Sequence, residues 1–192
     1  MANTDQPSGF TPVGTTDGSD WHGKLPTVQF AGDYAARAFV GDAVKLTGAG
    51  SVDGKYEQVE AAAAGDANIG AIVEILPSFE DEGSLTQMYK PASTERLAKV
   101  CFGSEVLYEV QETSIGGALT ADAIGSNIEL FADSGNVITG ISGHQINSST
   151  VTTGTAQFRI KHIARKSDNE LGDFCRWIVT VNENQDDNGV GV

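Results

Sequence analysis

The residues best suited to chemistry are three histidines and two cysteines, and their spacing forms no recognised site. The histidines are His22, His144 and His162, and none lies at zinc-ligand spacing from another histidine or from Cys101 or Cys175. His162 falls on the apolar side of an alternating segment, where a core histidine is expected. Both cysteines lie in apolar runs, so we expect them to be reduced and buried.

Two short motifs approach a functional signature, and each lacks a required part. Residues 140–144 (Gly-Ile-Ser-Gly-His) come close to the G-x-S-x-G turn of a nucleophilic serine, but the final glycine is missing and no helix pattern follows. Residues 48–53 begin like a dinucleotide fingerprint, yet Asp53 stands where the third glycine belongs. The sequence therefore predicts a protein that is not an enzyme and that holds no cofactor or metal.

The net charge excludes two classes of partner. The 192-residue chain carries a formal charge of −14. Such a surface repels the phosphates of nucleic acids and the headgroups of anionic membranes, so neither is expected as a partner. The first residues are polar, with neither a basic start nor an apolar stretch, so synthesis in the cytoplasm of a host cell is expected.

The elements that must carry any site are short strands separated by turns. Residues 155–163 and 175–181 alternate apolar with polar side chains, which predicts two strands with one buried face. Residues 97–102 and 106–110 are separated by Gly-Ser-Glu, which predicts a hairpin. Val137-Ile138 is expected as a further short strand. Close strand spacing without a long amphipathic helix predicts a mainly β fold, a barrel or a sandwich of short antiparallel strands.

The chain divides into three predicted parts. Residues 1–26 hold three prolines and no periodic pattern, which predicts an extended N-terminal arm. Residues 27–184 form the β body, either as one barrel or as two small lobes, 27–113 and 114–184. Residues 185–192 are polar and are expected to be a flexible tail. The arm is either a loose tail or a strap across a neighbouring subunit, anchored by Trp21, because buried tryptophan is a favoured interface anchor.

Positive charge is concentrated near the C-terminus. Five of the 12 basic residues lie within 18 positions: Arg159, Lys161, Arg165, Lys166 and Arg176. Such residues either keep an exposed strand face soluble or form a docking face for an acidic partner surface. Together with Trp21, they are the candidate residues for an interface with a partner or with another copy of the chain.

Two groups of motifs carry a resemblance to a known class of structural proteins. Residues 157–165, 169–173 and 177–183 are similar to the C-terminal end of structural proteins from marine and cyanobacterial tailed phages. Residues 41–46, followed by 65–66 and 69–73, resemble the strand-and-turn pattern of small capsid decoration (cement) proteins. The order of these motifs carries the resemblance, which covers about the last two-thirds of the chain.

The resemblance implies a β-barrel or β-tulip body on the outer surface of an HK97-type capsid. Its partner would be the major capsid protein, and the protein would form a homo-oligomer, a trimer by preference, that clamps neighbouring capsomers. Terminal arms of such proteins often reach across neighbours, a role that residues 1–26 would suit. The alternative is a carbohydrate-binding or host-attachment module on the virion surface, which would need exposed aromatic side chains in a groove.

Overall fold

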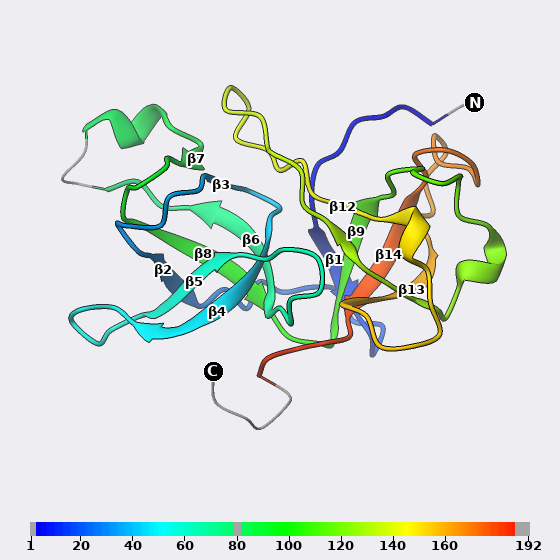
Figure 1. Ribbon diagram of the computed structural model, residues 1–192, viewed down its shortest axis with the longest axis horizontal. Helices are drawn as coiled ribbons and strands as arrows, with labels where there is room; N and C mark the ends of the chain where they lie inside the picture. Colours follow the sequence, from blue (N-terminus) through cyan, green and yellow to red (C-terminus); the bar gives the residue numbers. More distant parts are fainter. Residues whose placement is uncertain (1–2, 79–81, 187–192) are drawn as a thin grey trace.

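The protein is mainly β, as the sequence predicts. The computed structural model describes residues 3–78 and 82–186, and the helices in these ranges are the short 3-10 helices η1 (Glu82–Thr86), η2 (Ala121–Ala123) and η3 (Ser148–Thr150). The strands gather into two bodies that lie side by side (Figure 1). The predicted sheet architecture is therefore confirmed, and the two bodies have different topologies.

The first body is a closed five-stranded barrel. Its strands are β2 (Thr27–Phe30), β5 (Glu57–Ala61), β4 (Ala43–Gly50), β6 (Gly70–Ile75) and β8 (Arg96–Phe102), in that order around the barrel. The β2–β5 pair is parallel and the other pairs are antiparallel. A small ribbon of β3 (Ala38–Phe39) and β7 (Tyr89–Lys90) accompanies it. Closure removes the free strand edges that a five-stranded open sheet would expose.

The second body is an antiparallel five-stranded sheet. Its order is β1 (Thr11–Thr15), β9 (Val106–Gln111), β14 (Arg176–Val181), β13 (Phe158–Ile163) and β10 (Asn127–Ile128), and a ribbon of β11 (Leu130–Phe131) and β12 (Gln145–Ile146) packs with it. The two predicted C-terminal strands are confirmed as β13 and β14, which pair with each other. Strand β14 is central and buried on both faces, where the sequence predicted one buried face.

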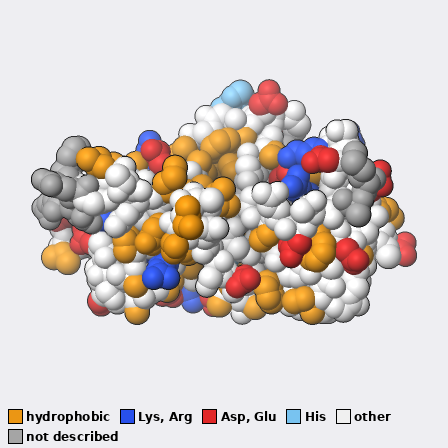
Figure 2. Space-filling model, turned by 90° about the horizontal axis from the view of Figure 1, so that it is seen from above, with side chains coloured by type: hydrophobic (Ala, Val, Ile, Leu, Met, Phe, Trp, Pro, Cys, Tyr) orange, Lys and Arg blue, Asp and Glu red, His pale blue; other side chains and the backbone are white. Residues whose placement is uncertain are grey.

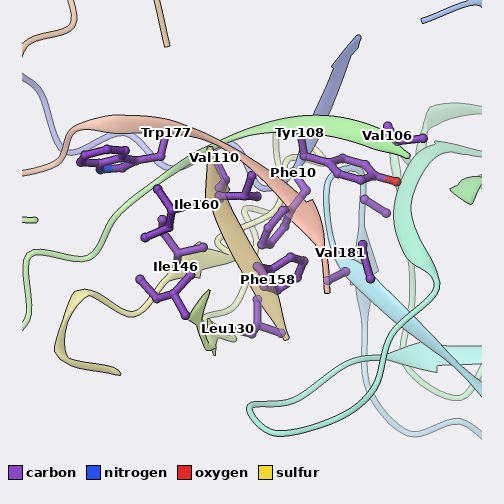
Figure 3. Packing of buried hydrophobic residues seen from close by; sticks show 14 of the residues in the cluster. Phe10, Val106, Tyr108, Val110, Leu130, Ile146, Phe158, Ile160, Trp177 and Val181 are labelled. Atoms are coloured by element: carbon purple, nitrogen blue, oxygen red, sulfur yellow. The ribbon is translucent and has the colours of Figure 1, made fainter. Parts of the chain in front are cut away.

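Large aromatic side chains fill the second core. The ring of Phe10 stacks on Phe158 with 4.5 Å between ring centroids and meets Tyr108 edge-on at 6.3 Å. Trp177 is completely buried in the same cluster (Figure 3). Both cysteines are free and buried, as predicted. Burying each large side chain is worth about 1.5–3 kcal/mol, so this cluster is a principal source of stability for the second body.

The predicted hairpin of residues 97–110 is wrong. Strand β8 pairs with β2 and β6, whereas β9 pairs with β1 and β14. Gly103, with φ of +117°, turns the chain out of the barrel and into the second sheet. The division between the bodies therefore falls between Phe102 and Val106, before the predicted boundary at 113. Each strand finds its partner in a different body because apolar pairing along both edges outweighs the short local turn.

Part of the predicted arm belongs to the body of this chain. Residues 11–15 form β1, which pairs with β9, and Phe10 lies in the second core. The Asn3 side chain donates to the carbonyls of Glu170 and Asp173 at 2.8 and 3.0 Å. The described part of residues 1–26 is thus held by its own chain, and the sequence missed β1 because Pro12 and Gly14 hide its period.

Hydrogen bonds lock the two bodies together. Buried Gln157, just before β13, donates to the carbonyls of Ala63 and Asp66 in the β5–β6 connection of the barrel at 2.8 and 2.7 Å and accepts from the Leu130 amide. Gln185 Oε1 accepts from the Leu46 amide of β4 at 2.7 Å. Residue 185 is therefore anchored, although the sequence placed it in a flexible tail; residues 187–192 lie outside the described ranges. The junction also has an apolar part, because Ala43, Ala71 and Cys101 of the barrel belong to the same buried cluster as the aromatic side chains of the second body.

Candidate functional site

An exposed apolar surface lies beside the junction of the two bodies. The surface is formed by two segments, residues 85–88 from the end of η1 towards β7 and residues 137–141 in a turn. Leu85 and Ile138 are 76% and 85% exposed, and three further large apolar side chains in these segments are also exposed. We call these five residues the apolar ridge: Leu85, Met88, Val137, Ile138 and Ile141. Seen from above, hydrophobic side chains gather over this part of the molecule (Figure 2). Clustered exposed apolar residues of this kind mark binding surfaces, whereas single ones do not.

Close backbone packing brings the two halves of the apolar ridge together. Gly140 has φ of +73°, and a side chain there would overlap Met88, so the 132–141 loop approaches η1 and β7 closely only because residue 140 is glycine. The Val40 amide donates to the Gly140 carbonyl at 3.0 Å, and the Ser142 amide donates to the Val40 carbonyl at 2.9 Å. Backbone hydrogen bonds to Val40 therefore hold the 137–141 half of the ridge in place, and close packing at Gly140 holds it against Met88.

The predicted strand at Val137-Ile138 is wrong, and its failure explains why the sequence missed the ridge. Asn136 Oδ1 accepts from the amides of Ile138 and Thr139, and the segment forms a turn. Asparagine side chains commonly organise turns in this way. The turn lifts two β-branched side chains into solvent, and a sequence pattern reads such residues as a buried strand. The Gly-Asn pair directly before Val137 and Ile138 was the one sequence feature that indicated a turn instead of a strand.

A cleft next to the ridge has a buried polar pair among its lining residues. The cleft measures about 400 Å3, and its walls include Tyr34, Phe39 and Asp133. His144 Nε2 lies 3.6 Å from Asp42 Oδ1, and both residues are almost fully buried. His144 Nδ1 accepts from the Ala43 amide at 3.1 Å, so it carries no proton. Burial lowers the pKa of His144 and raises that of Asp42, each partly offset by the other's charge.

The Ser-Gly-His motif provides no nucleophile in this arrangement. Ser142 is 2% exposed, and its Oγ accepts from the backbone amide of His144 at 2.9 Å. Its hydroxyl also lowers the pKa of Asp42 through a hydrogen bond. The lone pair of His144 Nδ1 is taken by Ala43 and its other nitrogen faces Asp42, so the imidazole cannot accept the proton of Ser142. These residues instead connect the barrel to the second body.

Two predicted basic residues are paired with carboxylates of the same chain. Lys166 Nζ lies 2.6 Å from Glu109 Oε1, and Arg176 lies 3.7 Å from Asp168. Arg159 and Arg165 are exposed, and Lys161 is half-buried on β13. The positive charge of the group is therefore partly neutralised. Trp21 takes no part in these ion pairs and is half-buried against the core of the second body.

Each body also buries an ionisable side chain that is bonded mainly to backbone groups. Lys90 donates to the carbonyls of Tyr34 and Ala36 at 2.6 and 3.0 Å, and burial lowers its pKa to about 8. Glu112 accepts from the Leu119 amide at 2.9 Å, and burial raises its pKa to about 7. Neither lies in the cleft, and backbone groups occupy both, so we assign them no chemistry.

Comparison with known proteins found no match among protein-family models, curated proteins or solved structures. In the described ranges, no helix is long and apolar enough to cross a membrane. No group of three or more histidine, cysteine, aspartate or glutamate side chains in the same ranges could hold a metal ion. The geometry of the described surface is thus the guide to function, and the apolar ridge is its most distinctive feature.

Proposed function

We propose that this chain is a structural virion protein that binds the outer surface of a tailed-phage capsid and clamps neighbouring capsomers. The observation that supports a binding function is the apolar ridge, two exposed apolar segments that pack against each other at Gly140. The capsid as partner comes from the sequence resemblance. The major capsid protein would receive the ridge, and the virion surface would be the site of action.

The rigidity of the molecule supports a clamping role. A clamp must transmit force between two contacts, so its bodies should not rotate freely about one another. Here Gln157 and Gln185 bridge the bodies through buried or part-buried hydrogen bonds. The loop that carries Ile138 is tied to Val40 beside the barrel. Each copy would contribute a modest contact, and many copies on a shell would give stability through multivalency.

The negative charge of the chain favours binding to a different protein over association of copies of this chain in solution. At −14 per copy, molecules in solution repel one another and remain soluble until they meet a complementary surface. On the shell, oligomer formation, with a trimer favoured, would follow from the symmetry of the capsid sites. Arg159 and Arg165, which are exposed, would assist docking if the partner surface is acidic.

The test is add-back of purified protein to capsids that lack it, followed by cosedimentation and cryo-electron microscopy. We expect Ile138→Asp to weaken capsid binding at least tenfold, because a charge in a desolvated contact costs more than about 1.4 kcal/mol. Val52→Asp is the matched control, since Val52 is fully exposed on the β4–β5 turn, away from the ridge. Equal binding of both variants, or density on a tail fibre instead of the shell, would reject the proposal.

A further inference from the structure

A second concave site lies where the segment between β1 and β2 passes the start of β9. It is a pocket of about 200 Å3, and its lining includes Trp21, Asp20, His22, Lys24, Phe102 and Glu105. Figure 1 shows this segment running from the second body to the barrel. The pocket shares no residue with the apolar ridge or with the cleft beside it.

Trp21 is fixed along one edge and forms part of the pocket wall. Its indole N–H is buried beside the thiol of Cys101, whose pKa it lowers while burial raises it. The side chain is half-buried and packs against the core of the second body. Phe102 and Val106 add further apolar surface to the same wall. An anchored indole gives a ligand ring a rigid face to stack on, with little loss of side-chain entropy.

Polar groups on the rim are available to a ligand. Asp20 and Glu105 are exposed, and their carboxylates make no hydrogen bond or ion pair to another side chain in the described ranges. Lys24 is exposed and supplies a donor on the same rim. Asp17 differs, because hydrogen bonds from Thr15 and Ser19 already occupy it and lower its pKa to about 2. The rim thus offers two free acceptors and one cationic donor.

We propose that this pocket binds a single neutral hexopyranose unit of a glycan. The apolar C–H face of the sugar would stack on Trp21, and its hydroxyls would donate to Asp20 and Glu105 and accept from Lys24. Pockets for drug-sized ligands measure roughly 300–1,000 Å3, so a smaller one suits one ring. Acidic sugars are disfavoured, because their carboxylate would meet Asp17, Asp20 and Glu105. This activity is additional to capsid binding and independent of the ridge.

Tryptophan fluorescence can test the proposal directly. The chain has two tryptophans, and Trp177 is completely buried, so acrylamide quenching reports mainly on Trp21. Titration with glucose, galactose, mannose and N-acetylglucosamine at millimolar concentration should protect Trp21 from quenching about twofold for at least one sugar. Glucuronate should give no protection. Absence of protection by all four neutral sugars would overturn the proposal.

Variants separate a binding role from a structural one. Trp21→Ala should abolish sugar binding, but loss of packing could also unfold the chain, so Glu105→Gln and Asp20→Asn provide the second test. Both residues are exposed, and each variant should weaken sugar binding about tenfold with the melting temperature unchanged. Asp53→Asn, in the exposed turn after β4, is the matched control. Unchanged binding in both rim variants would contradict the site even if capsid binding is intact.

Discussion

Each body buries a charged side chain that contacts mainly backbone groups, and the two side chains have opposite sign and opposite kinds of backbone partner. In the barrel, Lys90 donates to two carbonyls and lies 4.5 Å from the centre of the Tyr34 ring. In the second body, Glu112 accepts from the amides of Leu119 and Cys175. Neither forms an ion pair with an oppositely charged side chain in the described ranges. Backbone groups, with the Tyr34 ring beside Lys90, therefore take the place of an opposite charge, and burial shifts the pKa of both side chains towards the neutral form.

Truncating the largest buried side chain of either core is expected to have the largest effect on stability. Trp177 in the second body and Phe30 in the barrel are both completely buried. We expect Trp177→Ala and Phe30→Ala each to lower the free energy of unfolding by about 3–5 kcal/mol. Because the bodies share buried apolar contacts and hydrogen bonds, a single cooperative transition is expected for both variants in urea. Two separate transitions would show that the bodies unfold independently and would break the comparison.

Because the pKa of Glu112 is raised in the folded protein, we expect the free energy of unfolding to fall as pH rises through the acid range. Its pKa is about 7 when folded and near 4.5 when unfolded, so the folded state holds more protons between these values. Stability therefore falls as pH rises from about 4.5 to about 7, by at most about 3 kcal/mol. Urea unfolding at pH 5 and pH 8 measures this fall, and Glu112→Gln should flatten it. An unchanged slope in that variant would assign the effect to other groups.

Because the pKa of Lys90 is lowered in the folded protein, we expect the free energy of unfolding to rise with pH in the alkaline range. Its pKa is about 8 when folded and near 10.5 when unfolded, so the unfolded state holds more protons between these values. Stability should therefore rise from about pH 8 towards pH 10, by about 2 kcal/mol, because the buried cation is neutralised. Lys90→Met should lack this rise. If wild type and variant respond alike to pH, Lys90 is charged and well accommodated, and the parallel with Glu112 fails.

The functional surfaces were only partly foreseeable. Residues 1–26 were interpreted either as a loose tail or as a strap anchored by Trp21, and Trp21 lies in a pocket wall, packed against the buried cluster that includes Cys101. The basic group of residues 159–176 was interpreted either as a solubilising strand face or as a docking face, and in the structure Lys166 and Arg176 pair with carboxylates of the same chain. The apolar ridge was not foreseen, since a turn organised by Asn136 cannot be distinguished from a short strand by its apolar residues alone.

The sequence by itself determined the mainly β class, the strands of residues 158–163 and 176–181 and the buried, free state of both cysteines. Alternation and composition are local properties, and they carry this information directly. Only the tertiary structure decided that β8 and β9 belong to different bodies, that β1 joins the second sheet and that the ridge segments meet at Gly140. Strand pairing and close backbone approach depend on residues far apart in the chain, where packing outweighs the local pattern.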